Sequence, residues 1–336
     1  MREILVIRFG ALGDLCVLTW ALAHLSDNAH EQPVRVTLVT KAQFAPLMAE
    51  VRGVDEVIGL SDSRLKSLAQ LSRTIKSRNW DMVIDAHNTL RSNLLLGFMG
   101  RRPDARLTKD TFARLAFMGW SRRDKKLSRT MRDRFFDLTQ TLAGQEVEPT
   151  PPPLNSLVSA SPQSDIIGLA PGAQWDSKRW PEKNYAQLIR DLLNQKKSEI
   201  NVFLGPRENA WFPKSELQRV VSESPTVSIV QLPSLIEVAR RLADCKVVVT
   251  NDSGILHLAE AVGTHVLAFY GPTVREFGYF PQLNASRVME IDISCRPCSR
   301  NGKRACHRGD LACLEQIAPN TVLNTLVEMG HGGTGQ

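Results

Sequence analysis

Short apolar runs of strand length alternate with amphipathic segments in the first half of the chain. Residues 3–9, 34–40 and 82–85 are such runs, and residues 15–25 carry apolar side chains at helical spacing. Strands that alternate with helices need right-handed crossover connections, and these produce a parallel sheet. The first half is therefore predicted to be a Rossmann-like, doubly wound α/β domain.

The same alternation begins again after residues 149–164, a segment with five prolines that is typical of an extended linker. Beyond it, the pattern predicts strands at 166–170, 200–204, 246–250 and 266–270, and helices at 185–195, 235–243, 255–261 and 319–330. We therefore expect an N-terminal domain over 1–148, the linker, a C-terminal domain over 165–318 and a final helix over 319–330. Ligands of doubly wound sheets bind at the carboxyl ends of the strands, so the turns after strands are the places to look for chemistry.

Length and composition agree with two globular domains. The chain has 336 residues, of which 43% are hydrophobic and 23% are charged. No apolar run reaches the ~18 residues of a membrane span. The apolar N-terminal stretch is interrupted by Arg8 and Asp14, and no signal-peptide cleavage site follows it. A cytoplasmic protein is therefore expected.

The net charge of +7 is unevenly distributed, because residues 101–134 hold 12 Lys and Arg against 4 Asp and Glu. A basic segment of this kind attracts the phosphates of nucleic acid, of anionic lipid or of a phosphorylated substrate. An ordinary solvated face is an equally good interpretation of the charge alone.

The first turn of interest follows the strand at 3–9 and contains Gly10, Gly13 and Asp14. It lacks the G-x-G-x-x-G spacing of dinucleotide-binding proteins. The glycines permit close approach of the backbone to a substrate, and a carboxylate at the mouth of the turn could accept a proton from an attacking hydroxyl. The alternative is that Asp14 only caps the following helix.

A second turn, residues 251–257, follows the strand at 246–250. Ser253 and Gly254 present N–H groups at a helix start, which is an arrangement that binds diphosphates. His257 lies one turn later on the same helix face and could contact a phosphate or a ribose hydroxyl. A capped helix with a core-facing histidine would give the same pattern.

A third turn, residues 171–181, joins a strand to a helix and contains two cations, Lys178 and Arg179, together with Trp175 and Trp180. The cations suit a leaving diphosphate. The alternative function for the tryptophans is apolar packing over the start of the helix.

The cysteines fall into two groups. Cys16 and Cys245 lie in apolar surroundings and are predicted to be core residues. The other four lie within nineteen positions: Cys295, Cys298, Cys306 and Cys313. In a reducing compartment these are thiols or metal ligands, and the C-x-x-C spacing suits a structural zinc or iron site.

Together, the three turns resemble the bacterial lipopolysaccharide heptosyltransferases of glycosyltransferase family 9. The similar segments are residues 4–14, 168–185 and 251–273, which extend over essentially the whole chain. The resemblance implies a GT-B fold, in which two Rossmann-like domains flank an interdomain cleft. It also implies an inverting transfer of heptose from ADP-heptose to a lipopolysaccharide core or related glycolipid, near the cytoplasmic face of the inner membrane.

The resemblance also implies roles for single residues. Asp14 is the general base on the acceptor hydroxyl, and Lys178 steadies the departing diphosphate. The donor side is Ala173, Trp180, Asp252, Ser253, Gly254, His257, Gly271 and Thr273. The acceptor side is Arg8, Gly10, Gly13 and Arg91. No cofactor is implied for catalysis, because protein cations and helix dipoles supply the electrostatic stabilisation.

A second short turn on the acceptor side, residues 85–92, also resembles the family. His87 stands where the family often has glutamine, which changes the acceptor contact expected at this position. The basic segment 101–134 is similar in place to the family's acceptor-binding region and suits a phosphorylated lipid at a membrane surface.

Two other function classes remain as alternatives. A nucleic-acid-binding or regulatory protein with a cysteine-bound metal would account for the basic segment and the four cysteines, but aromatic residues are not interleaved with the charges and no nucleic-acid partner is expected. A dinucleotide-dependent oxidoreductase would share the sheet architecture but should carry the missing glycine fingerprint.

Overall fold

The computed structural model describes residues 1–29, 33–62, 64–119, 127, 129–143, 151–158, 165–195 and 199–330. The chain forms two compact units. The first consists of Met1–Asp110 and Arg129–Leu157, and the second of Thr111–Ser128 and Val158–Gln336. Segment 111–128 thus belongs with the second unit, although its position in the sequence lies within the range expected for the N-terminal domain. Of the predicted linker, only 151–158 lies in the described part of the chain.

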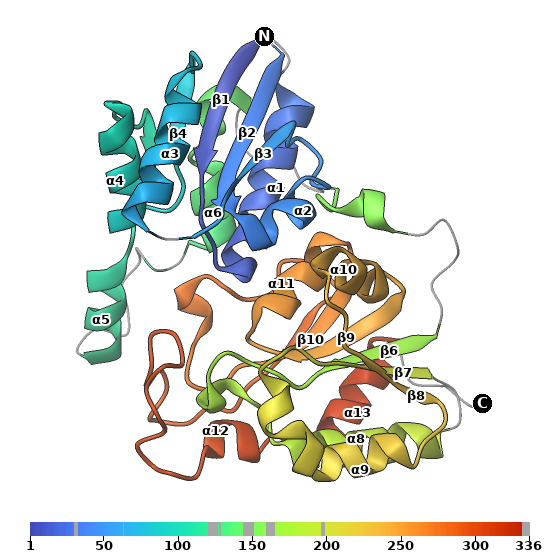
Figure 1. Cartoon of the computed structure of the whole chain (residues 1–336). Helices are drawn as coiled ribbons and strands as arrows, with labels where there is room; N and C mark the ends of the chain where they lie inside the picture. The colour runs from blue at the N-terminus through green and yellow to red at the C-terminus, as the bar shows by residue number, and fades with distance from the viewer. Residues whose placement is uncertain are drawn as a thin grey trace. The chain divides into compact units, whose positions relative to one another are not determined.

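The first unit is built on a parallel sheet with the strand order β3-β2-β1-β4-β5 (Figure 1). Its strands are β1 (Arg2–Ile7), β2 (Val34–Lys41), β3 (Glu56–Leu60), β4 (Met82–Asp85) and β5 (Ala105–Arg106). Ile7 pairs with Asp85, so β1 and β4 end side by side.

Helices cover both faces of this sheet. They are α1 (Leu12–Asn28), α2 (Ala45–Met48), α3 (Leu65–Lys76), α4 (Leu90–Met99), α6 (Met131–Phe136) and α7 (Gln140–Ala143). Apolar residues of α3 and α4 pack on one face with Leu5, Ile7 and Phe9. Helix α1 is buried from Leu15 to Leu25 because α6 and α7 pack against it in addition to the sheet.

The second unit has a parallel sheet with the order β11-β10-β9-β6-β7-β8. Its strands are β6 (Ile166–Ala170), β7 (Glu199–Phe203), β8 (Val227–Val230), β9 (Cys245–Asn251), β10 (His265–Phe269) and β11 (Arg287–Met289). Its helices are α5 (Thr111–Gly119), α8 (Glu182–Asn194), α9 (Glu216–Ser222), α10 (Leu235–Ala243), α11 (Gly254–Ala261), α12 (Ala312–Glu315) and α13 (Pro319–Glu328).

An aromatic stack lies at the centre of the second unit. The Trp180 ring stacks on Phe269 at 4.4 Å between centroids and meets the edge of Tyr185 at 4.9 Å. All three side chains are fully buried, in a core that α8, α9 and α13 complete. The loop before α8 is therefore attached to the core by its last tryptophan.

The predicted architecture of two parallel-sheet α/β domains is confirmed. Every strand predicted from an apolar run is present, although the first ends at Ile7 rather than at residue 9. Strands β3, β5, β8 and β11 were not predicted. Within the described ranges, no helix combines the length and the apolar character that a membrane-spanning helix needs.

Candidate functional site

The strand order of the first unit places one candidate site at the ends of β1 and β4. The chain passes from β1 to β2 on one side of β1, whereas β4 lies on the other side of β1. The gap between β1 and β4 is therefore the topological switch point of the sheet. The turn with Gly10, Gly13 and Asp14 follows β1, and the turn with His87 and Arg91 follows β4. Both predicted acceptor-side turns are thus neighbours.

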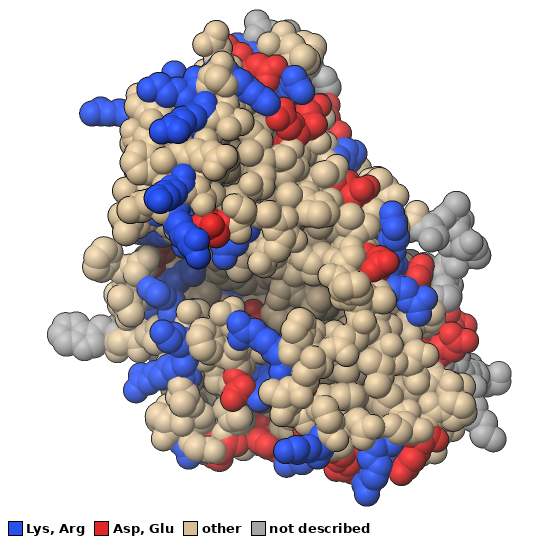
Figure 2. Space-filling view, viewed as in Figure 1, with Lys and Arg blue, Asp and Glu red and all other residues tan. Residues whose placement is uncertain are grey.

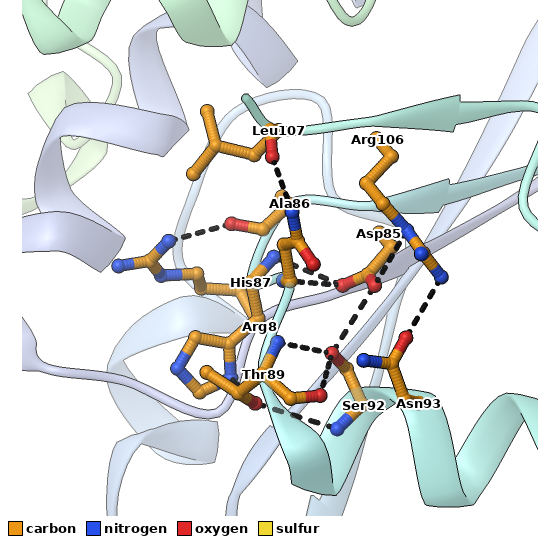
Figure 3. Close-up of polar contacts among 10 residues, drawn as sticks. Arg8, Asp85, Ala86, His87, Thr89, Ser92, Asn93, Arg106 and Leu107 are labelled. Carbon is orange, nitrogen blue, oxygen red and sulfur yellow. Dashed lines mark hydrogen bonds and ion pairs between the residues drawn. The ribbon is translucent and has the colours of Figure 1, made fainter. Parts of the chain in front are cut away.

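Arg8 and Asp14 form an ion pair within this site. Arg8 Nη2 lies 2.8 Å from Asp14 Oδ2. Arg8 Nη1 donates to the carbonyl of Ala86 at 2.5 Å, as Figure 3 shows. The Arg8 guanidinium is buried and lies 5.4 Å from the centre of the Phe135 ring. Arg8 therefore links the two turns and orients the Asp14 carboxylate.

Asp14 is the third residue of α1, and Ala11 rather than Asp14 is the N-cap. The carboxylate accepts a hydrogen bond from the Ala11 N–H at 3.4 Å, and one fifth of the side chain is exposed. Gly10 has φ +137°, and a Cβ there would lie 3.0 Å from the Phe44 ring, so this position requires glycine. Gly13 lies in the first turn of α1 and is partly exposed.

A buried carboxylate, Asp85, fixes the second turn. It accepts hydrogen bonds from the His87 N–H at 3.1 Å and from the Ser92 hydroxyl at 3.1 Å, and it pairs with Arg106 at 3.3 Å (Figure 3). Asp85 lies at the end of β4 and has no exposed surface. The sequence motif contained this residue, but its anchoring role depends on Arg106 from β5.

His87 is surrounded by cations. Burial is the main reason why its pKa is lowered to about 4, followed by the charges of Arg8, Lys109 and Arg91, while Asp14 acts in the opposite direction. The imidazole is therefore neutral at pH 7, and its ring meets Phe9 edge-on at 5.7 Å. The same surroundings attract an anionic group of a ligand.

Lys109 was not singled out from the sequence. Its position in the basic segment 101–134 was the only indication in the sequence that it belongs to a site. Residues 120–126 and 128 of that segment lie outside the described part of the chain. Arg91 was predicted, and its guanidinium lies 5.9 Å from the Phe9 ring centre.

The switch point of the second sheet lies between β6 and β9, and two predicted donor-side turns meet there. Asn251, at the end of β9, is buried and ties them together. Its side-chain amide donates to the Pro171 carbonyl at 2.9 Å, and its side-chain oxygen accepts from the Trp180 N–H at 2.9 Å.

Three predicted donor-side residues form a chain of polar contacts. Lys178 Nζ lies 2.5 Å from Asp252 Oδ2, and the Thr273 hydroxyl donates to the same oxygen at 2.8 Å. The Lys178 and Asp252 side chains are only 12% and 10% exposed. Arg179, in contrast, pairs with Asp176 and stacks on Trp211, so it does not take part in this series of contacts.

The start of α11 has unused hydrogen-bonding capacity. Ser253 is the N-cap, yet its hydroxyl makes no capping bond, and the buried Oγ has no partner within the described residues. Gly254 begins the helix, whose first N–H groups need partners from outside. His257 follows one turn later, is buried, and has its ring 6.0 Å from that of Tyr279. An anion with several oxygens matches this set of donors.

The other predicted donor residues have supporting positions. The Trp180 indole is a core group whose Nε1–H donates to the Ile317 carbonyl, so its side chain offers no surface to a ligand. A Cβ on Gly271 would lie 2.8 Å from Leu314, so this backbone is closely packed. Ala173 is partly exposed in the loop after β6.

Glu208 is a candidate that the sequence analysis missed. Its Oε2 accepts from the Gly205 N–H at 2.7 Å, and a Cβ on Gly172 would lie only 2.3 Å from its Oε1. The carboxylate thus lies at the carboxyl ends of β6 and β7, against a glycine that leaves room for it. The only indication of this site in the sequence was that glycines, Gly172 and Gly205, follow two of the predicted strands.

The prediction of a structural zinc or iron at the cysteine cluster is not supported. No three His, Cys, Asp or Glu side chains among the described residues are grouped so that they could hold a metal ion. All four thiols are free. Burial raises the pKa of Cys313 to about 11, and burial together with the neighbouring Cys295 and Cys306 raises the pKa of Cys298.

Comparisons with known proteins agree on one family. The family model described as glycosyltransferase family 9 (heptosyltransferase) matches residues 68–307. The chain is 25% identical to lipopolysaccharide heptosyltransferase 2 of Salmonella typhimurium, over 96% of this chain and 97% of that protein. It is also 25% identical to lipopolysaccharide heptosyltransferase 1 of Pseudomonas aeruginosa, over 88% of this chain and 86% of that one.

A solved structure of similar fold is the heptosyltransferase WaaC of E. coli with ADP. Its TM-score is 0.73 at 20% identity, with 97% of this chain and 99% of that chain covered.

Proposed function

Since the chain belongs to glycosyltransferase family 9, we propose that it transfers a heptose from ADP-heptose to the lipopolysaccharide core or a related glycolipid. The curated relatives are lipopolysaccharide heptosyltransferases, and a protein of similar fold has been solved with ADP. The observation that carries the proposal is the Lys178–Asp252 pair next to the open start of α11, because it joins a cation to a set of N–H donors at the strand ends.

The donor diphosphate is expected at α11. The helix N–H groups at Gly254, the unpartnered Ser253 hydroxyl and the His257 ring supply hydrogen bonds to its oxygens. Lys178 neutralises charge on the diphosphate, since an ammonium has three N–H donors and Asp252 takes one of them. Glu208 is positioned to accept hydrogen bonds from ribose hydroxyls, as acidic residues at strand ends do in related sheets.

The proposed reaction is a direct displacement. The acceptor hydroxyl oxygen bonds to the anomeric carbon, its proton passes to the Asp14 carboxylate, and the bond between that carbon and the diphosphate oxygen breaks. ADP leaves with the electron pair, and the configuration of the anomeric carbon is inverted. Arg8 keeps the Asp14 carboxylate oriented, while the Gly10–Gly13 backbone allows the acceptor to approach.

The cations near His87 suit an acceptor that carries phosphate or carboxylate groups. Arg91 and Lys109 are the residues expected to contact these groups, because their charges act on His87 at this site.

A panel of nucleotide sugars tests the donor assignment. Calorimetry should detect tighter binding of ADP-heptose than of UDP- or GDP-linked sugars, and mass spectrometry should detect one added heptose on a core glycolipid. If no ADP-linked sugar binds, the donor assignment is wrong.

We further propose that the outer face of α4 contacts the surface of an anionic membrane. Leu90 is 76% exposed and Phe98 is 42% exposed, and with Leu94 they lie on one face at four-residue spacing. Arg101 and Arg102 follow the helix directly. Figure 2 shows Lys and Arg side chains gathered on the side of the first unit where Figure 1 draws α3 and α4. Apolar side chains with adjacent cations are typical of segments that bind anionic interfaces.

Vesicle sedimentation tests the membrane contact. The protein should bind vesicles of phosphatidylethanolamine and phosphatidylglycerol and not vesicles of phosphatidylcholine. Replacing Leu90 and Phe98 by serine should lower this binding by at least about tenfold, because their apolar surface is lost. The control is Ile229→Ser, which removes an exposed apolar side chain, 47% exposed, on β8 of the other unit. Equal binding by both variants would reject α4 as the contact.

A further inference from the structure

The cysteine-rich segment lies against the donor side of the second unit. Residues 295–302, called here the 295–302 loop, contact two of the predicted donor segments. The loop reaches residues 271–273 through its first half and residues 177–178 through its last residue.

Arg296 makes the first contact. Its buried guanidinium donates from Nε to the Gly271 carbonyl at 2.5 Å and from Nη2 to the Thr273 carbonyl at 2.9 Å, and it pairs with Glu290 at 2.7 Å. The N–H of Cys298 adds a bond to the Pro272 carbonyl at 3.2 Å. Three consecutive carbonyls of the 271–273 turn are therefore held by this loop.

Gly302 makes the second contact. The Ser177 hydroxyl donates to the Gly302 carbonyl at 2.5 Å, and the Gly302 N–H donates to the buried Ser299 hydroxyl at 2.9 Å. Gly302 has φ +88°, and a Cβ built on it would lie 2.8 Å from both Cγ and Cε of Lys178. Distances under 3 Å are not tolerated between carbon atoms, so the Lys178 stem lies directly on the Gly302 backbone.

These contacts form a continuous series that begins and ends at the 295–302 loop. Gly302 packs on Lys178, Lys178 pairs with Asp252, Asp252 accepts from Thr273, and the Thr273 carbonyl returns to Arg296 of the same loop. The loop thus restricts the position of the Lys178 methylene chain directly, through Gly302. It restricts the position of the ammonium group indirectly, through Thr273 and Asp252.

We propose that the 295–302 loop is a positioning element for donor binding, in which Gly302 fixes the Lys178 side chain by steric contact and Arg296 fixes the turn that carries Thr273. The expected effect of this loop on nucleotide binding rests on the proposed function. Its structural part, the restraint of Lys178, is independent of that function.

The test is Gly302→Ala with Gly309→Ala as a matched control. Both glycines have positive φ, +88° and +78°, but a Cβ on Gly309 meets nothing within 4 Å. Both variants therefore share the backbone strain, and only Gly302→Ala displaces Lys178. We expect Gly302→Ala to weaken ADP binding by at least about tenfold and Gly309→Ala to change it by less than about threefold. In a Lys178→Ala background, Gly302→Ala should cause no further loss, because the two changes act through one side chain.

A second measurement needs no nucleotide. Acetylation of Lys178, followed by mass spectrometry, should be faster in Gly302→Ala than in the wild type and unchanged in Gly309→Ala. Ser177→Ala, which removes the hydroxyl bond without changing the backbone, should shift the rate in the same direction. Equal rates in all four proteins would overturn the proposal, as would equal losses of ADP affinity in the two glycine variants. If wild-type protein binds no ADP, the proposed function fails, while the acetylation rates still decide the role of the loop.

Discussion

Replacing Asp14 by asparagine is expected to lower the rate of sugar transfer by about 10³-fold while ADP affinity stays within about twofold of wild type. The amide has the same shape and can still accept the hydrogen bond from the Ala11 N–H, but it cannot take the acceptor proton. Steady-state assays of ADP release give the rate, and calorimetry gives the affinity.

The matched control for this variant is Asp27→Asn. Asp27 lies on the same helix, α1, and also pairs with an arginine, Arg52. It should retain wild-type transfer, because its ion pair is far along the helix from the first turn. A wild-type rate in Asp14→Asn would reject the base assignment. A parallel loss of rate and ADP affinity would indicate damage beyond the loss of a base.

Replacing Lys178 by alanine is expected to weaken ADP binding by about 10–100-fold, because a hydrogen-bonded charge contact to the diphosphate is lost. The variant also leaves the nearly buried Asp252 carboxylate without a cation, and this negative charge then repels the ligand. Calorimetric titration with ADP measures the change.

Two further variants separate these causes. Lys183→Ala removes an exposed lysine that pairs with Glu315 at 2.9 Å, and ADP affinity should not change. Adding Asp252→Asn to Lys178→Ala removes the repulsion, so part of the affinity should return. Unchanged ADP affinity in Lys178→Ala would reject its contact with the diphosphate, and equal losses in the two lysine variants would indicate a general effect of charge.

The sequence predicted the central strands of both sheets and missed those at or near the edges. Strands buried on both faces, such as β1 and β9, are continuous apolar runs that stand out in the sequence. The edge strand β8 has the burial pattern of a half-exposed strand, and β5 has only two residues. Their polar positions break the apolar run, and their pairing depends on neighbours that are distant in sequence.

The turns after β1, β6 and β9 could be located from sequence, because glycines and polar residues directly follow apolar runs there. The contacts between different turns could not be predicted from the sequence. Lys178 and Asp252 are brought together because β6 and β9 are neighbours in the sheet, and only the strand order determines this. The same holds for His87, whose pKa is lowered first by burial and then by cations from the turn after β1, from α4 and from the segment after β5.

The structure shows contacts of Arg8 within the protein that the sequence did not predict. The family resemblance implied that Arg8 helps to shape the acceptor side. Its burial and its bonds to Asp14 and Ala86 instead occupy the guanidinium within the protein. Sequence alone does not distinguish a cation that contacts a ligand from one that orients another residue.

The connectivity of the two units has a consequence for dissecting the protein. Since Thr111–Ser128 belongs with the second unit, the polypeptide passes from one unit to the other three times. Phe117 of α5 packs on Phe277, and Arg114 donates to the Phe277 carbonyl at 2.9 Å. A fragment that starts at Val158 would therefore leave the Phe277 surface uncovered. The second unit therefore cannot be expressed as one contiguous gene segment, and a cut at the proline-rich segment would leave α5 on the N-terminal fragment, separated from Phe277.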